Sequence, residues 1–260
     1  MWSPEVYLRF ADERGRPFHE LVARIGAPSR GEGAPARVLD LGCGPGNLTQ
    51  TLTRRWPEAL VHGVDSSPEM IEEARAKTAG VTYEVADAVT YEVPDEVDVI
   101  VTNALLHWIP GHDELLGRWV KPGRWIAMQV PANYAAPSHL LLRDVCASPH
   151  WAGRLGDLNR ARVVGDAVHY GRLLRAAGCA VDTWETNYVH QLPVLPQRPH
   201  PVLTWMTGTA LRPVRARLDD AEWEEFCAEL DNALWTGYPA DGDVVDFPFL
   251  RVFAVAHRER

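Results

Sequence analysis

The first half of the sequence alternates short apolar segments, rich in β-branched residues, with amphipathic segments of helical period. The apolar segments are expected strands at 37–41, 60–65, 81–85, 97–102 and 125–130. Between the first two, residues 47–56 form an expected helix, and Ser67-Pro68 is expected to begin another, with serine as N-cap and proline in the first helical position. Strands that alternate with helices predict an α/β fold with a doubly wound parallel sheet.

The second half is less regular. A helix is expected at 167–177 and a long β-branched strand at 180–192, and a final strand is expected within 249–256. Roughly fifty residues, mostly helical in pattern, separate these last two strands, which is too long for a plain loop in a compact domain. We therefore expect four parts, which are a lid segment at 1–30, an α/β core at 31–192, a helical cap at 193–245 and a last core strand at 246–260.

Charge and composition exclude several classes of function. The net charge of -9 argues against a nucleic-acid partner, because the phosphate backbone requires a concentrated basic surface. No long apolar run predicts a membrane span, and the amino terminus lacks the apolar core of a signal peptide, so a cytoplasmic protein is expected. The four cysteines are widely scattered, which predicts neither a zinc site nor a disulfide framework, and no metal is expected.

A glycine-rich segment follows the first expected strand. Its chemistry-bearing residues are Asp40, Gly42, Gly44, Gly46 and Asn47. The glycines allow the backbone to turn sharply and to approach a ligand closely, and the next helix offers its first N–H groups. The G-x-G-x-G spacing differs from the pyrophosphate-binding G-x-G-x-x-G pattern. Asp40 would repel a phosphate but could accept a hydrogen bond from an ammonium group, so this loop is a candidate site for a ligand of that kind.

Two further acids come after the second and third expected strands. Asp65 is placed to accept hydrogen bonds from two ribose hydroxyls, and Asp87 could accept one from an adenine amino group, while Ala88 leaves room for the ring. Each acid alone is a weak signal, because an aspartate after a strand is more often a helix cap or a turn former. In this order behind the glycine loop, they indicate a cofactor site.

The segments DLGCGPGN, GVDSSPEM, ADA and NALLHW together resemble the motifs of class I S-adenosylmethionine-dependent methyltransferases. The segments MWSPEVYLRFADERGRP, LHWIPGH, MQVPANYAAPSH, AGCAVDTWETNYVHQL and WMTGTALRP are similar to the trans-aconitate 2-methyltransferase family, over nearly the whole chain. The resemblance implies a Rossmann-like core, S-adenosyl-L-methionine as cofactor, and methylation of one carboxylate of trans-aconitate to a monomethyl ester. Residues 149–164 depart from the family's pattern.

The resemblance also implies roles for single residues. The three glycines would hold the amino acid part of the cofactor and Asp65 its ribose. Met70 would lie against the adenine, Asp87 would bind the adenine amino group, and Asn103 would contact the methionine end. Ser66 is either a second polar contact or part of the helix cap with Ser67.

The implied chemistry sets what a substrate site needs. A carboxylate is already ionised at neutral pH, because ordinary carboxyl pKa values lie near about 4, so no general base is required. Catalysis then depends on positioning, and a polycarboxylate needs several hydrogen-bond donors in a partly buried pocket. Candidates for this pocket are Tyr7, His107, Trp108, His139, Tyr170, His190, Gln191 and Arg212. His107 and Trp108 are expected to position the substrate.

Several alternatives remain open at this level. Tyr7 could pack against the sheet, His139 could start a helix, Tyr170 could belong to the core, and Arg212 could be a surface residue, whereas Trp205 and Trp235 are expected in the core of the cap. The acceptor could be another small acid or a carrier-protein-bound malonyl group, although the sequence shows no clear basic docking patch. A noncatalytic nucleotide-cofactor-binding protein is the alternative from a different class. A monomer or small homo-oligomer is expected.

Overall fold

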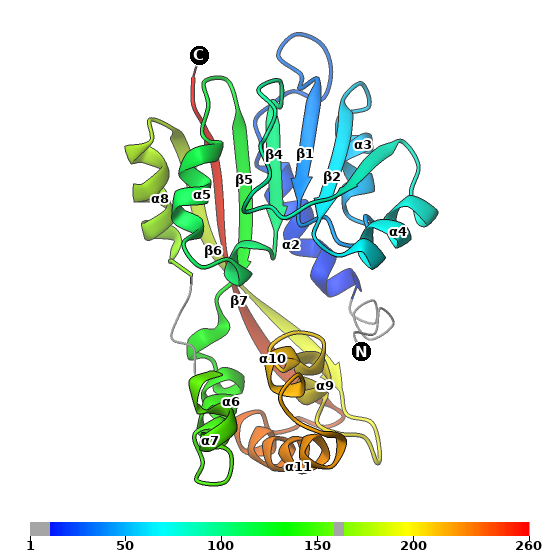
Figure 1. Cartoon of the computed structure of the whole chain (residues 1–260), viewed down its shortest axis with the longest axis vertical. Helices are drawn as coiled ribbons and strands as arrows, with labels where there is room; N and C mark the ends of the chain where they lie inside the picture. The colour runs from blue at the N-terminus through cyan, green and yellow to red at the C-terminus, as the bar shows by residue number, and fades with distance from the viewer. Residues whose placement is uncertain (1–10, 159–163, 260) are drawn as a thin grey trace. The chain divides into compact units, whose positions relative to one another are not determined.

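The computed structural model describes residues 11–158 and 164–259, and its central feature is a seven-stranded sheet (Figure 1). The strand order is β3-β2-β1-β4-β5-β7-β6. The strands are β1 (Arg37–Leu41), β2 (Leu60–Asp65), β3 (Val81–Val85), β4 (Val99–Asn103), β5 (Trp125–Pro131), β6 (Ala180–Pro193) and β7 (Val244–His257). All seven predicted strands are present, and β7 begins five residues before its predicted start.

The first five strands are parallel, as predicted. Strand β1 pairs with β2 and with β4, β2 pairs with β3, and β4 pairs with β5. The chain therefore runs outward from β1 to β3 and then returns to the other side of β1 to form β4 and β5. In sheets of this kind, ligands bind at the carboxyl ends of the strands where the strand order reverses, which is here between β1 and β4.

The helices also follow the local sequence signals. The longer ones are α2 (Ala11–Ala23), α3 (Thr49–Arg55), α4 (Pro68–Lys77), α5 (His112–Trp119), α6 (Pro137–Cys146), α8 (Ala167–Ala176), α9 (Pro201–Thr207) and α11 (Asp220–Gly237). The predicted cap of α4 is confirmed, because the Ser67 hydroxyl accepts a hydrogen bond from the Met70 N–H at 3.2 Å and Pro68 opens the helix. No helix within the described ranges is long and apolar enough to cross a membrane.

The chain divides into two compact units. We call the described residues within 14–131, 164–185 and 252–260 the sheet unit, and those within 1–13, 132–163 and 186–251 the helical unit. This division differs from the predicted boundaries, since residues 132–158 belong with 186–251 rather than with the core. The reason is packing at long range: the Ser138 N–H donates to the Tyr238 hydroxyl at 3.1 Å, and α6 lies against α11.

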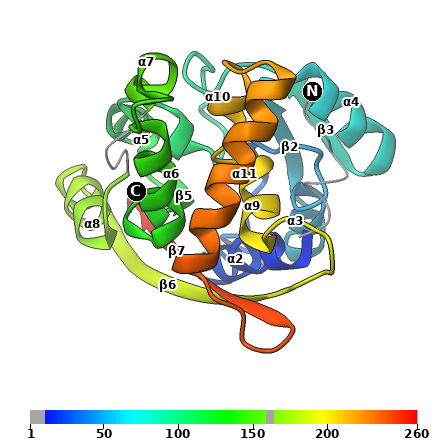
Figure 2. The same ribbon diagram turned by 90° about the horizontal axis from the view of Figure 1, so that it is seen from below.

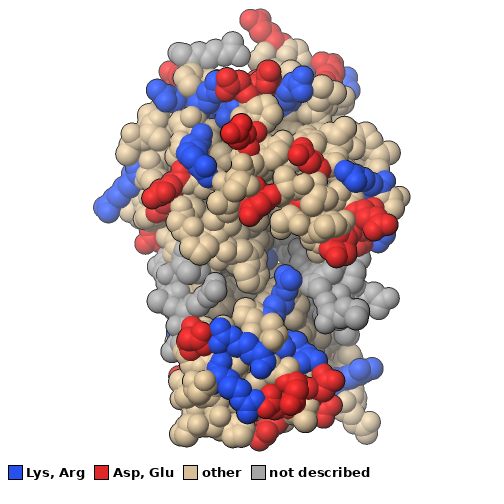
Figure 3. All heavy atoms as spheres, in the orientation of Figure 1, with Lys and Arg blue, Asp and Glu red and all other residues tan. Residues whose placement is uncertain are grey.

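The helical unit has a hydrophobic core of its own. Helix α11 lies between α6 and α9 (Figure 2), and its buried Phe226 and Leu230 join the large rings of Trp151 and Trp205. Trp205 is 2% exposed, in agreement with its predicted place in a core, and Trp235 packs against the same cluster. Basic and acidic side chains are interspersed on the face in Figure 3. In this unit, ion pairs join Arg154 to Glu222, Arg215 to Asp220 and Arg217 to Asp157.

Candidate cofactor site

The glycine loop after β1 is fixed to the end of β2. The N–H groups of Gly42 and Cys43 donate to the Val64 carbonyl at 2.8 and 3.1 Å, and the Gly44 N–H donates to Oδ2 of Asp65 at 2.9 Å. Gly42, Gly44 and Gly46 have φ of 77°, 54° and 76°, a left-handed conformation that costs other residues about 1–2 kcal/mol. The loop's shape thus requires glycine at all three positions.

The three glycines have different surroundings. A Cβ at Gly42 would lie 2.9 Å from the side chain of Leu105, and a Cβ at Gly46 would lie 2.5 Å from the Tyr83 hydroxyl. A Cβ at Gly44 would meet no described atom within 4 Å. Gly42 and Gly46 are therefore needed for packing within the protein, whereas Gly44 borders open space in which a ligand can approach the backbone.

Asp65 at the end of β2 accepts hydrogen bonds from the backbone of two segments, the glycine loop and the start of α4. Its Oδ2 accepts from Gly44 and its Oδ1 accepts from the Ser67 N–H, both at 2.9 Å. Each carboxylate oxygen can accept a second hydrogen bond. The predicted contact with a ribose stays compatible with this geometry, and a structural role for Asp65 is now established beside it.

Asp40 lies in β1, just before the glycine loop, and is only 3% exposed. Its Oδ2 accepts a hydrogen bond from the Thr49 hydroxyl at 2.6 Å. Burial raises the pKa of Asp40 from 3.8 to about 7, because the interior disfavours the charge; the Thr49 hydrogen bond opposes this rise and the nearby Asp65 carboxylate adds to it. Thr49 was not among the predicted residues. The sequence feature that could have indicated Thr49 is a hydroxyl side chain at the first position of the helix that follows the loop.

The acid after β3 has the turn-forming role that the sequence left open. Asp87 is exposed, and its Oδ1 accepts from the Val89 N–H at 2.9 Å. Ala88 is buried, and Val85 and Val89 expose 43% and 39% of their surface on either side of Asp87. This end of β3 thus combines apolar surface with a carboxylate, as an adenine site requires.

Three more of the expected cofactor residues lie in the sheet unit. Ser66 is exposed and the helix cap is formed by Ser67, so the cap alternative for Ser66 is excluded. Met70 is half-buried in the first turn of α4, and Asn47 is exposed just before α3.

Asn103 ends β4 and presents an unused acceptor. Its Oδ1 is buried and has no hydrogen-bond partner among the residues that the structure describes. The next residue, Ala104, has a φ of 56° and donates its N–H to the Gln129 carbonyl at 2.9 Å. Leu105 then packs on Gly42, which brings this turn to the glycine loop. A buried acceptor, a buried acid and open space at Gly44 fit a ligand that carries an ammonium group.

His107 and Trp108 follow directly in a 3-10 turn, η1 (Leu106–Trp108). Their ring centroids are 4.7 Å apart. His107 is half-buried, and Trp108 is 42% exposed although it is a large aromatic residue. Both belong to the sheet unit and come within five residues of Asn103 in the chain, so the predicted positioning role remains open to both.

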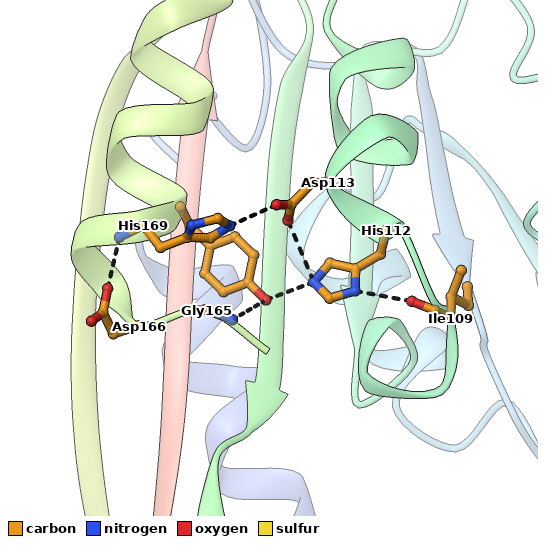
Figure 4. A network of polar contacts seen from close by, with 7 residues as sticks. Ile109, His112, Asp113, Gly165, Asp166 and His169 are labelled. Atoms are coloured by element: carbon orange, nitrogen blue, oxygen red, sulfur yellow. Dashed lines mark hydrogen bonds and ion pairs between the residues drawn. The ribbon is translucent and has the colours of Figure 1, made fainter. Parts of the chain in front are cut away.

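Tyr170 is different from the other substrate candidates because it is fully buried. Its hydroxyl accepts from the Gly165 N–H at 3.2 Å and shares a hydrogen bond of 2.8 Å with Nε2 of His112 (Figure 4). Nearby, Nε2 of His169 lies 2.7 Å from Oδ2 of Asp113. These contacts join α5 to the start of α8, and they favour the core alternative for Tyr170 over a role in a pocket.

The remaining described candidates lie in the helical unit. His139 is half-buried beside Tyr134, and burial lowers its pKa to about 4, so it is neutral at pH 7. His190 is 7% exposed and stacks on Trp205 at 4.8 Å, whereas Gln191 is exposed. Successive residues of a strand face opposite sides, so His190 and Gln191 do not act as a pair.

Arg212 and Tyr7 are the remaining predicted substrate residues. Arg212 is exposed at the first residue of α10 (Arg212–Arg215), and Tyr7 lies outside the described residues. Asn133, which the sequence did not single out, is 3% exposed. Its Oδ1 accepts from the Leu250 N–H at 2.6 Å, while its Nδ2 has no partner within the described part of the chain. A buried amide donor of this kind suits a carboxylate ligand.

Known proteins similar to this chain decide its family. Residues 38–123 match the family model described as a methyltransferase domain. A trans-aconitate 2-methyltransferase of Mycolicibacterium gilvum (strain PYR-GCK) is 50% identical over 98% of this chain and 98% of its own. One from Rhodococcus jostii (strain RHA1) is 48% identical over 98% of this chain and 99% of its own. This chain belongs to the trans-aconitate 2-methyltransferase family. The predicted enzyme class, a methyltransferase, is thereby confirmed.

Solved structures support the fold of this family member. A putative sarcosine dimethylglycine methyltransferase from Galdieria sulphuraria has a TM-score of 0.54 at 14% identity, with 100% of this chain and 92% of that one covered. Phosphoethanolamine N-methyltransferase 2 of Haemonchus contortus, solved in complex with S-adenosyl-L-methionine, has a TM-score of 0.52 at 18% identity, with 94% and 53% covered. These likenesses confirm the predicted Rossmann-like methyltransferase fold.

Proposed function

We propose that this protein transfers a methyl group from S-adenosyl-L-methionine to one carboxylate of trans-aconitate and releases the monomethyl ester. The observation that carries the proposal is the identity of 50% with a trans-aconitate 2-methyltransferase over 98% of both chains. The site geometry supports it independently, because the loop after β1 fits a ligand with an ammonium group. A cytoplasmic location, a monomer or small homo-oligomer and the absence of a nucleic-acid partner belong to the same proposal.

The cofactor residues keep their predicted roles within this proposal. When bound, S-adenosyl-L-methionine supplies a methyl group activated by a sulfonium. Gly44 allows its amino acid part to approach the backbone, and Asp40 and the free Oδ1 of Asn103 accept hydrogen bonds from it. Asp65 has lone pairs left for the ribose, and Asp87 has one carboxylate oxygen that the Val89 N–H does not use. Gly42 and Gly46 hold the loop in shape.

The substrate side needs no proton-transferring group. The attacking carboxylate is ionised at neutral pH, so rate depends on holding its oxygen in line with the methyl group and on excluding water. His107 and Trp108 are proposed to position the substrate. Asn133 joins the candidate donors, and Tyr170 leaves them because its hydroxyl is engaged by His112 and Gly165. His139, His190, Gln191 and Arg212 stay predictions, to be tested by single substitutions against KM.

The test is to incubate the protein and labelled cofactor with trans-aconitate, cis-aconitate, citrate or isocitrate, and to identify any ester by mass spectrometry. The monomethyl ester should form from trans-aconitate, and an Asn103→Leu variant, which removes the free acceptor, should bind the cofactor more weakly. Absence of an ester from trans-aconitate at millimolar concentration would remove the proposed acceptor. Binding of NAD without S-adenosyl-L-methionine, measured by calorimetry, would overturn the methyltransferase proposal itself.

A further inference from the structure

His112 links the end of the turn η1 to the buried Tyr170. It is the first residue of α5 and is 5% exposed. Its Nδ1 lies 3.0 Å from the carbonyl oxygen of Ile109, and its Nε2 lies 2.8 Å from the Tyr170 hydroxyl. A carbonyl oxygen only accepts hydrogen bonds, so Nδ1 carries the proton, and Nε2 of the neutral ring accepts from the Tyr170 O–H. The imidazole therefore joins the two groups in one defined direction.

The hydrogen-bond chain through this ring ends in backbone groups on both sides. The Tyr170 oxygen accepts from the Gly165 N–H at 3.2 Å, so the chain runs from Gly165 through both side chains to the Ile109 carbonyl (Figure 4). Tyr170 is fully buried and lies 58 residues from His112 in the sequence. Successive hydrogen bonds in a buried place strengthen one another. The chain thus connects the end of η1 with the segment that leads into α8.

The connection from η1 to α5 consists of residues 109–111. Gly111, the N-cap of α5, has a φ of 73° and provides no side chain to cap the helix. A Cβ at Gly111 would meet no described atom within 4 Å. Pro110 has no N–H to donate. The hydrogen bond from His112 back to Ile109 therefore holds a connection that its own residues do little to fix.

The turn that this hydrogen bond holds carries His107 and Trp108. Inside the turn, the N–H groups of Trp108 and Ile109 donate to the carbonyls of Leu105 and Leu106 at 2.9 and 3.1 Å. The Trp108 side chain is 42% exposed, so packing alone does not fix the orientation of its ring. The turn is one hydrogen-bonded unit that ends at Ile109. A contact at Ile109 therefore affects the direction in which both rings point.

We propose that His112 and Tyr170 are positioning residues for the methyl transfer, and that their hydrogen-bond chain holds η1 so that His107 and Trp108 meet the acceptor in one orientation. The inference rests on the proposed function, which takes these two rings as the groups that position the acceptor. His112 and Tyr170 act through η1, and they neither transfer a proton nor form a covalent bond. Their contribution is to the orientation on which an in-line displacement depends.

A second contact between the same two helices provides a matched control. Oδ2 of Asp113 in α5 lies 2.7 Å from Nε2 of His169 in α8, and these side chains are 41% and 44% exposed. An ion pair as exposed as this one contributes little to stability. Oδ1 of Asp113 lies 3.7 Å from Nε2 of His112, which is beyond hydrogen-bond distance. Asp113→Ala therefore breaks a link between α5 and α8 but leaves the chain from Gly165 to Ile109 intact.

The experiment measures steady-state kinetics with trans-aconitate and calorimetric binding of S-adenosylhomocysteine, on the whole protein and well below the Tm of each variant. Tyr170→Phe keeps the ring and removes the hydroxyl. It should raise KM for trans-aconitate about tenfold, with less effect on kcat, because the acceptor is held less well. The Kd of S-adenosylhomocysteine should stay within about twofold of its original value, since the glycine loop is unchanged. Asp113→Ala should change none of these constants.

His112 is tested by two substitutions of different severity. His112→Phe removes both hydrogen bonds of the ring, so KM for trans-aconitate should rise at least as much as in Tyr170→Phe. His112→Asn keeps an N–H group that can donate to the Ile109 carbonyl, so it should restore part of the lost affinity for the acceptor. If His112→Phe does not fold, His112→Asn and Tyr170→Phe still give the comparison.

A double-mutant cycle tests whether the chain acts through η1. Once His107→Gln has removed the ring that the chain orients, Tyr170→Phe should raise KM less than it does in the original protein. Effects of the two substitutions that simply multiply would show that Tyr170 does not act through His107, and they would overturn this route.

The outcomes separate this inference from the proposed function. Failure of the original protein to bind S-adenosylhomocysteine or S-adenosyl-L-methionine would overturn the proposed function and the inference that rests on it. If the protein methylates a different acid, the same comparison of KM is made with that acid. An unchanged KM in Tyr170→Phe, an equal rise in Asp113→Ala, or a loss of cofactor affinity as large as the rise in KM would overturn the positioning role alone.

Discussion

Gly44→Ala and Gly46→Ala form a matched pair of variants that tests how the glycine loop works. Both residues have positive φ, at 54° and 76°, so alanine at either position costs about 1 kcal/mol from the backbone. Of these two residues, Gly46 alone has no room for a Cβ, since this atom would lie 2.5 Å from the Tyr83 hydroxyl and 2.9 Å from the Cβ of Ala74. Such overpacking adds about 1–3 kcal/mol.

The expected free energy of unfolding therefore falls by about 1 kcal/mol in Gly44→Ala and by about 2–4 kcal/mol in Gly46→Ala. For a chain of this size, each kcal/mol lowers Tm by about 2–4 °C, which scanning calorimetry resolves. Cofactor affinity should follow the opposite order, with the larger loss in Gly44→Ala. Gly44→Ala should lose cofactor affinity although it is nearly as stable as the original protein, because its methyl group enters the open space where the ligand approaches.

Tyr83→Phe provides the decisive control, because it removes the hydroxyl that the new methyl group would meet. In the original protein this change should cost about 1 kcal/mol, since the hydroxyl accepts a hydrogen bond from Thr78 at 2.8 Å. In the Gly46→Ala background it should cost less or should stabilise. Equal stability of Gly44→Ala and Gly46→Ala, or strictly additive effects of Gly46→Ala and Tyr83→Phe, would refute the packing argument.

Three further predictions concern other parts of the sheet unit. Burial raises the pKa of Asp40 to about 7, so the folded protein holds a proton that the unfolded chain releases above pH 3.8. Stability should therefore fall by up to about 4 kcal/mol as pH rises from about 4 to about 7. Asp40→Asn should flatten this decline in urea unfolding curves, and an unchanged slope would contradict it. His107→Gln should raise KM for trans-aconitate and leave turnover flat above the acid range, whereas loss of turnover with a titration near the ordinary histidine pKa of about 6.5 would identify a base instead. Arg124 is 5% exposed and donates to the carbonyls of Val97, Trp119 and Pro94, so Arg124→Met should lower the free energy of unfolding by about 3 kcal/mol because buried acceptors lose their donor. Cofactor affinity measured well below Tm should not change in this last variant, and a loss of affinity there would show that the residue acts on the site.

The local features of the fold were predictable because local sequence determines them. Strand β1, the glycine loop, and the Ser67-Pro68 start of α4 each depend on residues within a few positions of one another. The order of the acids after the parallel strands also placed Asp65 beside the loop, since the carboxyl ends of neighbouring parallel strands meet at one edge. For the same reason the family resemblance could be stated from short motifs.

A separate helical part was predicted at 193–245, but the membership of residues 132–158 in the helical unit was not, because it depends on contacts between residues far apart in the sequence. Residues 132–158 directly follow β5, yet they pack with α11 through contacts such as that of Ser138 with Tyr238, one hundred residues away. Burial also separated candidates that looked alike. Tyr170 faces the core and is held by His112, whereas Trp108 is exposed.

The positions of the strands along the chain, the glycine loop and the acids that follow the strands could all be read from short segments of sequence. The reason why each of these residues is needed became clear only from the packed structure. Gly46 is required because Tyr83 lies against it, Gly44 because it borders open space, and Asp40 because Thr49 and Asp65 approach it in a buried place. The physical reason is that burial and close contact depend on partners that are distant in the sequence, and these partners set both the packing and the charge state of the site.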